Sequence, residues 1–175
     1  MCRLLYDANG KGHVVKIVDS FLDDKTYLDL LELAGNDQHW VLLDKEGTAS
    51  KYEMELPDYL VKDIEQQYRS KIINRTEFGI DPQNFKAGLV KCEPGYWYPP
   101  HKDHATKVIS TVVYLSPKEA PATLFPGAQS PRWRSNRLVA WKNEGQVHWY
   151  KNDTEFNRYT LNIYQMNKET LFVVE

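Results

Sequence analysis

The sequence predicts an α+β protein in which N-terminal helices support a double-stranded β-helix, or jelly roll. In the first part of the chain, apolar residues recur at helical spacing in two separate stretches. After Asp81 the pattern changes to short segments rich in β-branched and aromatic residues, separated by turn residues. Helices followed by many short strands are typical of an α+β fold, and strands of this kind favour a double-sheet jelly roll. No repeat or low-complexity linker interrupts the 175 residues, so we expect one domain, with a helical part over residues 1–80 and a jelly-roll part over residues 81–175.

Two amphipathic helices are predicted in the N-terminal part. Either Ser20 or Asp23 can cap the first helix, and Gly35 is its expected end. Its apolar residues are Tyr27, Leu28, Leu31 and Leu33. The second helix begins at Pro57, a residue that is favoured at helix starts. Its apolar face consists of Leu60, Val61, Ile64, Tyr68, Ile72 and Ile73.

The remaining segments have the composition and alternation of strands. In the N-terminal part, the predicted strands are His13–Asp19, Trp40–Leu43 and Lys51–Leu56. In the second part they are Phe85–Cys92, Lys107–Leu115, Ala122–Phe125, Arg137–Trp141, Val147–Trp149, Asn157–Gln165 and Leu171–Val174. Turn residues lie between several of them, at Pro94-Gly95, Pro126-Gly127 and Asn143-Glu144-Gly145.

Composition limits the classes of function. The formal net charge is −2, which gives no electrostatic reason to expect a nucleic-acid partner. The two cysteines, Cys2 and Cys92, form neither a disulfide framework nor a CxxC zinc motif, which fits a reducing compartment. Asp7 follows the N-terminus too closely for a signal peptide, and no apolar run has membrane-spanning length. We therefore expect a soluble, cytoplasmic protein with no membrane partner, while its oligomeric state stays open.

A candidate metal site is centred on His101-x-Asp103. Residues at i and i+2 of a strand share one face, so the imidazole and the carboxylate can bind one ion. The 2-His-1-carboxylate iron site needs one further histidine. His148 is the best candidate because it lies on a later predicted strand, after the Asn143-Glu144-Gly145 turn. Three ligands on one face leave open positions for a bidentate 2-oxo acid and dioxygen, whereas zinc with three ligands and a water is the competing interpretation. We expect His104 on the opposite face, at the surface or behind the ligands.

Arg158 begins a strand with clean alternation. Arg158, Thr160, Asn162 and Tyr164 share one face, and the intervening Tyr159, Leu161 and Ile163 share the other. If the apolar face packs on the core, the polar face lines a cavity, where an arginine requires an anion. The distal carboxylate of 2-oxoglutarate is such an anion, and a guanidinium can bind it in bidentate fashion. The hydroxyl of Tyr114 can donate to the same carboxylate.

These residues resemble the prolyl 4-hydroxylase branch of the 2-oxoglutarate/Fe(II) dioxygenases over about Lys91 to Met166. The motif Tyr-x-x-Gly-x-x-Tyr-x-x-His-x-Asp of that family corresponds here to Cys92, Gly95, Tyr98, His101 and Asp103. Cys92 replaces the first tyrosine, which removes a hydroxyl that the family often places near the co-substrate. The family's Tyr-Leu-Asn resembles Tyr114-Leu115-Ser116, and its Gly-Gly-x-x-x-Phe-Pro segment is kept only as Phe125-Pro126.

The resemblance implies an enzyme that couples hydroxylation of a substrate to decarboxylation of 2-oxoglutarate, which yields succinate and CO2. It implies Fe(II), 2-oxoglutarate and O2, with ascorbate as a candidate reductant. His101, Asp103 and His148 would bind iron, Arg158 and Tyr114 would hold the far carboxylate, and Asn162 would lie near the co-substrate. The implied substrate is peptidyl proline or a similar side chain. Candidate substrate contacts are Tyr98, Trp97, Trp133 and Tyr164, and the loop carrying Arg132 to Arg134 is a candidate flap.

Several alternatives remain open at the level of sequence. One is a hydroxylase of a free amino acid or another small molecule, and another is a catalytically silent jelly-roll module that binds metal. A zinc hydrolase would need a general base, for which Glu144 is the nearest carboxylate to His148 in sequence. The related nucleic-acid demethylases carry Arg-x-Asn-x-x-x-Arg after the distal histidine. Here Thr160 and Tyr164 occupy the positions of the asparagine and the second arginine, which disfavours that branch.

Overall fold

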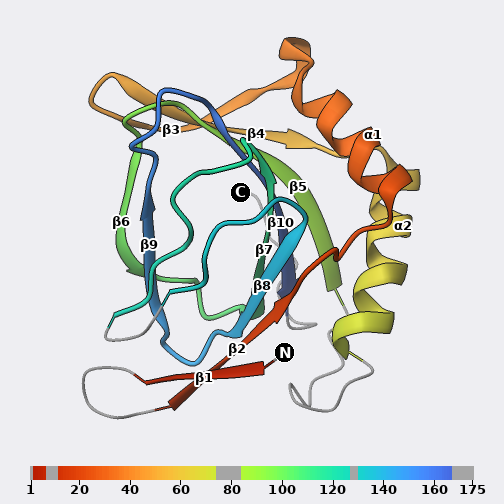
Figure 1. The fold of residues 1–175 in the computed structure, drawn as a ribbon, viewed down its shortest axis with the longest axis vertical. Coiled ribbons are helices and arrows are strands. Elements are labelled where there is room, and N and C mark those ends of the chain that lie inside the picture. The colour runs from red at the N-terminus through yellow and green to blue at the C-terminus, as the bar shows by residue number, and fades with distance from the viewer. Residues whose placement is uncertain (1, 7–11, 74–83, 127–129, 167–175) are drawn as a thin grey trace, which may run out of the picture.

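The computed structural model describes residues 2–6, 12–73, 84–126 and 130–166, and within these ranges the side chains from Val15 onward except that of Ile73. Its strands form two sheets that face each other (Figure 1). The eight-stranded major sheet has the order β1-β2-β8-β7-β10-β5-β4-β3, and the two-stranded minor sheet pairs β6 with β9. All pairings between these strands are antiparallel. This arrangement agrees with the predicted jelly roll supported by helices.

The bounds of the elements are as follows. The helices are α1 (Asp24–Ala34) and α2 (Asp58–Tyr68), with a 3-10 turn at Asp37–His39 and a π-helical turn at Arg69–Ile73. The first strands are β1 (Cys2–Tyr6), β2 (Gly12–Val18), β3 (Val41–Glu46), β4 (Ala49–Glu55) and β5 (Asn84–Cys92). The others are β6 (Trp97–Lys102), β7 (Lys107–Ser116), β8 (Arg137–Lys142), β9 (Val147–Lys151) and β10 (Arg158–Met166).

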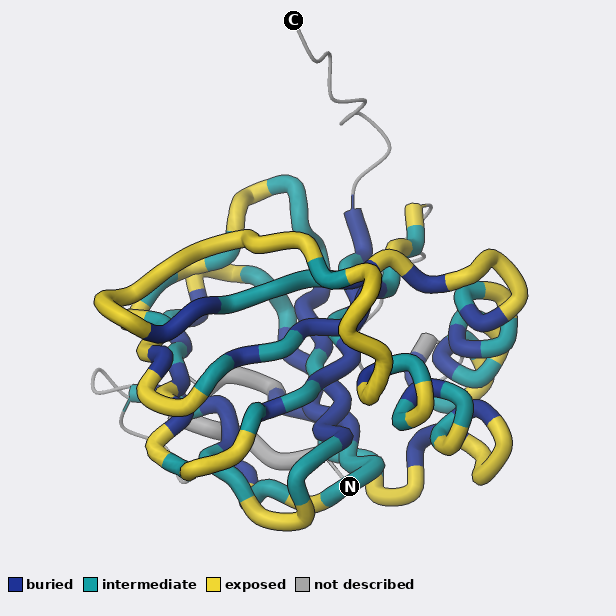
Figure 2. The backbone as a smooth tube through the Cα atoms, turned by 90° about the horizontal axis from the view of Figure 1, so that it is seen from above, coloured by how far each residue is buried: buried dark blue, intermediate teal, exposed yellow. Residues whose placement is uncertain are grey.

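The N-terminal part contributes strands as well as helices. β1 and β2 extend the major sheet beyond β8, and β3 and β4 extend it beyond β5. β3 is one of the two edge strands of the major sheet and is exposed along its whole length (Figure 2). The helical part and the jelly-roll part predicted from sequence are therefore joined within one sheet.

Most predicted elements occur close to their expected bounds. Of the two candidate caps, Asp23 is the one used: its Oδ1 accepts a hydrogen bond of 2.8 Å from the backbone N–H of Thr26, and the helix ends at Gly35. Two strands were not predicted, β1 and β6. The prediction of a strand over Ala122–Phe125 is wrong, because the structure has only an isolated bridge between Leu124 and Trp149 there. The strand predicted over Leu171–Val174 lies outside the described residues.

The main hydrophobic core lies between the helices and the outer face of the major sheet. In Figure 1 both helices lie on the side of that sheet away from β6 and β9. Leu30 of α1 and Leu60 and Ile64 of α2 are fully buried there, and Leu161 and Ile163 of β10 belong to the same cluster. Because alternate residues of β10 face the helices, its other residues face the minor sheet. Within the described ranges, no helix has both the length and the apolar character needed to cross a membrane.

Candidate active site

His101 and His148 form a cross-strand pair in the minor sheet. They lie directly opposite each other in the β6–β9 register, and their ring centroids are 4.3 Å apart. The register shifts between Tyr98 and His101, so two residues of β6, Pro99 and Pro100, have no partner in β9. Directly opposed residues of an antiparallel pair project to the same side, which explains why two histidines 47 positions apart in sequence meet.

Asp103 follows the end of β6 and is held by the major sheet. Its Oδ1 accepts a hydrogen bond of 2.9 Å from Nζ of Lys107, and its Oδ2 accepts one of 2.5 Å from Oγ of Ser110. Both partners belong to β7. The amide of Asn143 fixes the connecting loop by donating to the carbonyls of His104 and Lys107, at 2.7 Å and 3.0 Å. Asp103 therefore connects the end of β6 in the minor sheet to β7 in the major sheet.

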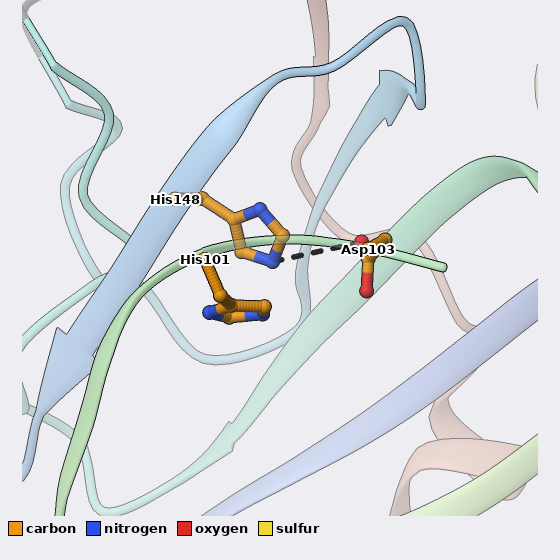
Figure 3. Close-up of side chains that lie close together, drawn as sticks. All are labelled: His101, Asp103 and His148. Carbon is orange, nitrogen blue, oxygen red and sulfur yellow. Dashed lines mark ion pairs between the residues drawn. The ribbon is translucent and has the colours of Figure 1, made fainter. Parts of the chain in front are cut away.

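The three side chains converge on one point (Figure 3). Their potential ligand atoms all lie within 4.8 Å of one another, and Nε2 of His148 is 3.6 Å from Oδ2 of Asp103. Nδ1 of His101 lies 2.9 Å from the carbonyl of Pro99, and Nδ1 of His148 lies 3.4 Å from the carbonyl of Gln146. When both Nδ1 atoms carry the proton, both Nε2 atoms are free to bind a metal. This donor set fits a divalent transition metal with open positions.

The protonation states at neutral pH suit metal binding. Burial lowers the pKa of His148 to about 4, against the opposing charge of Asp103, so the imidazole is neutral. Burial alone would raise the pKa of Asp103, but the neighbouring His148 and Lys107 and the Ser110 hydroxyl favour the carboxylate, and the pKa is lowered. Neither residue has to lose a proton at pH 7 before it can bind a cation.

A cavity of about 60 Å³ lies beside the three residues. The polar face of β10 lines it, as expected from the alternation, with Arg158, Thr160, Asn162 and Tyr164. The rest of its lining consists of Lys51, Tyr98, His101, Asp103, Lys107, Ser110, Thr111, Val112, Thr123, Trp141, His148 and Tyr150. A second, larger cleft of about 540 Å³ shares Lys107 and Tyr164 with it, so the two spaces adjoin.

Arg158 is buried at this cavity, with 2% of its surface exposed. Its Nε donates a hydrogen bond of 3.2 Å to the carbonyl of Pro121, but its buried Nη2 has no hydrogen-bond partner among the described residues. The guanidinium carbon is 4.3 Å from the ring centroid of Tyr150 and 5.0 Å from that of Trp133. A buried guanidinium nitrogen with no acceptor is costly, which indicates that an anion belongs there.

Asn162 lines the cavity, whereas Tyr114 is not among its lining residues and lies beside Arg158. The Tyr114 hydroxyl is fully buried and accepts a hydrogen bond of 3.0 Å from the backbone N–H of Thr123. The Arg158 guanidinium is 5.9 Å from the Tyr114 ring centroid. The Asn162 amide donates to the Tyr164 hydroxyl at 3.1 Å and accepts from the Thr160 hydroxyl at 3.0 Å. Thr160, Asn162 and Tyr164 therefore form a row of hydrogen-bonded side chains along β10.

The four predicted substrate contacts have different surroundings. Tyr98 lines the cavity, with its ring centroid 4.1 Å from that of His101, and Tyr164 lines both the cavity and the larger cleft. Trp133 stacks on Tyr114 with 4.4 Å between ring centroids, so it lies at the Arg158 end. Trp97 is 44% exposed and lines neither space.

Sequence reasoning did not identify Lys51, Lys107, Ser110 and Tyr150. Ser110 shares a face with Tyr114 by strand alternation, so extending the argument used for Tyr114 along β7 would have found it. Lys107 is the first residue of the same strand. Tyr150 is two residues after His148 on β9, again on the same face. Lys51 carries no local signal, because only the pairing of β4 with β5 brings it to the cavity.

Comparison with known proteins places this fold. No protein-family model and no curated protein matches the sequence, but solved structures do. A prolyl-4-hydroxylase from Pseudomonas putida has a TM-score of 0.68 at 16% identity, over 89% of this chain and 94% of its own. A viral collagen prolyl hydroxylase from Paramecium Bursaria Chlorella virus-1, solved with 2-oxoglutarate, has a TM-score of 0.64 at 15% identity, over 87% and 96%.

A third similar structure is a prolyl hydroxylase from Trichoplax adhaerens, in complex with a peptide fragment of the hypoxia inducible factor oxygen degradation domain. Its TM-score is 0.65 at 12% identity, over 87% of this chain and 83% of its own. At these identities the likeness establishes the fold. The chain has the jelly-roll fold of the prolyl hydroxylases, which confirms the predicted fold class, and it carries a His-Asp-His cluster.

The low pKa of His148 predicts that the metal-free protein loses stability in mild acid. Unfolded His148 binds a proton below about pH 6.5, whereas folded His148 does so only below about pH 4. Between these values the unfolded state binds more protons, so the free energy of unfolding falls as the pH falls, by about 3 kcal/mol in total. Urea unfolding at several pH values measures this slope. His148→Gln, which cannot titrate, should flatten it, and an unchanged slope in that variant would contradict the assignment.

The three-ligand cluster predicts metal-dependent stabilisation. Saturating Mn(II), a stand-in for Fe(II) that is stable in air, should raise the melting temperature, because a ligand bound only by the folded state adds about 2.7 kcal/mol at 100 times its Kd. Asp103→Ala should lose most of this increase. His104→Ala is the matched control, since His104 is exposed and outside the cluster, and it should keep the increase. Equal stabilisation of the Asp103→Ala variant by Mn(II) would exclude the cluster as the site.

Proposed function

We propose that this protein is a 2-oxoglutarate- and Fe(II)-dependent dioxygenase that hydroxylates its substrate. One observation carries the proposal: a His-Asp-His cluster and a buried arginine with an unpaired guanidinium nitrogen line the same cavity. The first fits a ferrous ion with open positions, and the second fits a carboxylate at a distance from it. The fold of the prolyl hydroxylases adds support from an independent direction.

His101, Asp103 and His148 would hold the iron, and Arg158 with Tyr114 would hold the distal carboxylate of 2-oxoglutarate. When bound together, iron and the 2-oxo acid supply oxidative decarboxylation, which yields succinate and CO2 and delivers one oxygen atom of O2 to a substrate C–H bond. The protein would bind and orient the iron, the co-substrate and the substrate, and it would exclude water from the site. The orphaned Nη2 of Arg158 would gain its missing acceptor, and the rings of Tyr114, Trp133 and Tyr150 keep water from the guanidinium.

The substrate that we propose is a peptidyl proline or a similar side chain. The similar Trichoplax adhaerens enzyme binds a peptide fragment, and the larger cleft beside the cavity offers room for such a segment. Tyr164 lines both the cavity and the cleft, and Tyr98 lines the cavity beside His101. The two tyrosine rings would form an aromatic wall for the proline ring of the substrate. A free amino acid or another small molecule is the second candidate, favoured by the small volume of the cavity itself, about 60 Å³.

Two other classes have less support. A zinc hydrolase needs a general base near the metal, but Glu144 is exposed in the turn between β8 and β9 and lines neither the cavity nor the cleft. Asp103 is the only carboxylate in the described lining of the cavity, and it is part of the ligand cluster. A silent metal-binding module leaves the unpaired nitrogen of Arg158 without a role.

Replacing Arg158 tests the proposal directly. Arg158→Gln should weaken binding of 2-oxoglutarate by about 10- to 150-fold, because hydrogen bonds to a charged group contribute about 1.5–3 kcal/mol. The Michaelis constant for 2-oxoglutarate, measured from succinate formation with Fe(II) and O2, should rise by a similar factor. The rate at saturating 2-oxoglutarate should change less, because Arg158 contacts the end of the molecule away from the iron.

Arg134→Gln is the matched control for this variant. Arg134 is an exposed arginine whose side chain pairs with Asp19 at 3.3 Å and does not line the cavity, so its replacement should leave the Michaelis constant unchanged. Succinate formation that requires Fe(II) and 2-oxoglutarate supports the enzyme class even before a substrate is known. If Arg158→Gln keeps wild-type affinity for 2-oxoglutarate, Arg158 does not bind the co-substrate.

A further inference from the structure

Lys51 presents an ammonium group to the cavity and forms no ion pair with any residue that the structure describes. It belongs to β4, is half-buried and lines the same cavity as the His-Asp-His cluster. Its Nζ lies 4.1 Å from the ring centroid of Tyr98. Across the described part of the chain, Nζ forms no hydrogen bond or ion pair. Burial is the main reason that the pKa of Lys51 is lowered, and the charge of Lys107 acts in the same direction, against smaller opposing effects of Cys92, Asp44 and Glu53.

The register of the major sheet separates Lys51 from Arg158. Cys92 of β5 pairs with Lys51 of β4 on one side and with Arg158 of β10 on the other, so all three project to the cavity side. Adjacent strands are about 4.8 Å apart, which puts the Lys51 and Arg158 backbones about 10 Å apart. Arg158 packs on Tyr150 and Lys51 packs on Tyr98, and these two rings are 5.6 Å apart between centroids. Lys51 and Arg158 therefore lie at two different positions in the cavity, and each can bind a different anionic group.

Lys51 is the one cationic side chain of the described cavity lining that has neither a counter-charge nor a proposed ligand. Lys51, Lys107 and Arg158 are its cationic side chains, and Asp103 is the only carboxylate among its described lining residues. Lys107 already pairs with Asp103 at 2.9 Å. Arg158 is assigned to the co-substrate. A ferrous ion and the dianion of 2-oxoglutarate cancel in net charge, and Lys107 is offset by Asp103, so Arg158 and Lys51 leave the loaded site with an excess of positive charge. Of these two cations, Lys51 is the one with no proposed ligand.

We infer that Lys51 binds a carboxylate of the substrate that is hydroxylated. This rests on the proposed function and adds to it the chemical class of the substrate, an acid. Tyr98, on which the ammonium packs, also contacts His101, with 4.1 Å between ring centroids. A carboxylate bound to Lys51 would be separated from His101 by the ring of Tyr98. A substrate held there would lie near the proposed metal ligands. The carboxylate comes either from a free acid or from an acidic side chain of a peptide.

The competing explanation is that the contact with Tyr98 alone satisfies Lys51. A cation–π contact stabilises an ammonium without any ligand. Lys91 on β5 provides an internal comparison: its Nζ packs over Trp40 at 4.9 Å and over Tyr52 at 4.7 Å, and it also pairs with Asp37 at 3.5 Å. Lys91 does not line the cavity. Lys91→Met therefore removes a similar cation–π lysine without touching the site.

The test uses the full chain loaded with Mn(II) and N-oxalylglycine, an analogue of 2-oxoglutarate that does not react. Binding of N-oxalylglycine is measured first, by calorimetry. Paramagnetic line broadening by Mn(II) in proton NMR then reports binding of two probe pairs. The free-acid pair is N-acetylproline and N-acetylprolinamide, and the peptide pair is N-acetyl-Pro-Glu-amide and N-acetyl-Pro-Gln-amide. In each pair only the carboxylate differs, so the pair that shows a preference identifies the source of the acid.

The wild type should prefer the acid of at least one pair, and Lys51→Met should weaken binding of that acid by about tenfold or more. Lys51→Arg should keep the preference, Lys91→Met should match the wild type, and N-oxalylglycine should bind every variant equally. If N-oxalylglycine binds but no acid is preferred, or if the preference survives Lys51→Met, this inference fails alone. If Lys51→Met weakens N-oxalylglycine instead, Lys51 serves the co-substrate and the inference fails. Failure of N-oxalylglycine to bind the wild type overturns the proposed function as well.

Discussion

The hydrogen bonds that hold Asp103 to β7 are the constraint on which the site depends. Two of the three candidate ligands come from the minor sheet, where they lie opposite each other across β6 and β9. The carboxylate lies beyond the end of β6, and among the described residues its hydrogen bonds come from Lys107 and Ser110 of the major sheet. A buried carboxylate is tolerated only when its oxygens are satisfied, so the two sheets must be correctly closed on each other before the third ligand is in place. The geometry of the proposed metal site therefore depends on how the two sheets of the jelly roll pack against each other.

β10 links the structural and the functional halves of the domain. Leu161 and Ile163 face the helices and are fully buried, while Arg158, Thr160 and Asn162 face the cavity. The helices contribute no side chain to the described cavity lining, so their role is to bury the outer face of the major sheet. Because β10 is the central partner of β5 and β7, a shift of its register by one residue would exchange these two sets of side chains. The apolar face therefore determines where the arginine lies.

Much of this arrangement was predictable from sequence because it depends on spacing within single strands. The alternation after Arg158 predicted the two faces of β10. The i, i+2 spacing suggested His101 and Asp103 as a pair, but Asp103 lies beyond the end of β6 and is held by hydrogen bonds from β7. β6 was not predicted, because Pro99 and Pro100 are untypical of strands and are tolerated here where the register shifts against β9. Lys51 and the pairing of Lys107 with Asp103 were not predicted either. Their positions follow from contacts between elements distant in sequence or from loop geometry, and no local pattern encodes those. Trp97 and Tyr98 were candidate substrate contacts because they precede the metal motif, and Trp133 because it lies in the candidate flap. The structure gives these residues different surroundings.

The central claim is that the metal and a 2-oxo acid bind together in one cavity, held by ligands from two sheets and by Arg158. Anaerobic titration of the Fe(II)-loaded protein with 2-oxoglutarate tests it most directly, because chelation of iron by the 2-oxo acid produces a weak visible metal-to-ligand charge-transfer band. The band should appear and saturate with one equivalent of 2-oxoglutarate bound per iron. If the protein binds Fe(II) tightly and no band develops at any 2-oxoglutarate concentration, the cavity does not accept a chelating 2-oxo acid, and the cluster serves a metal without this chemistry.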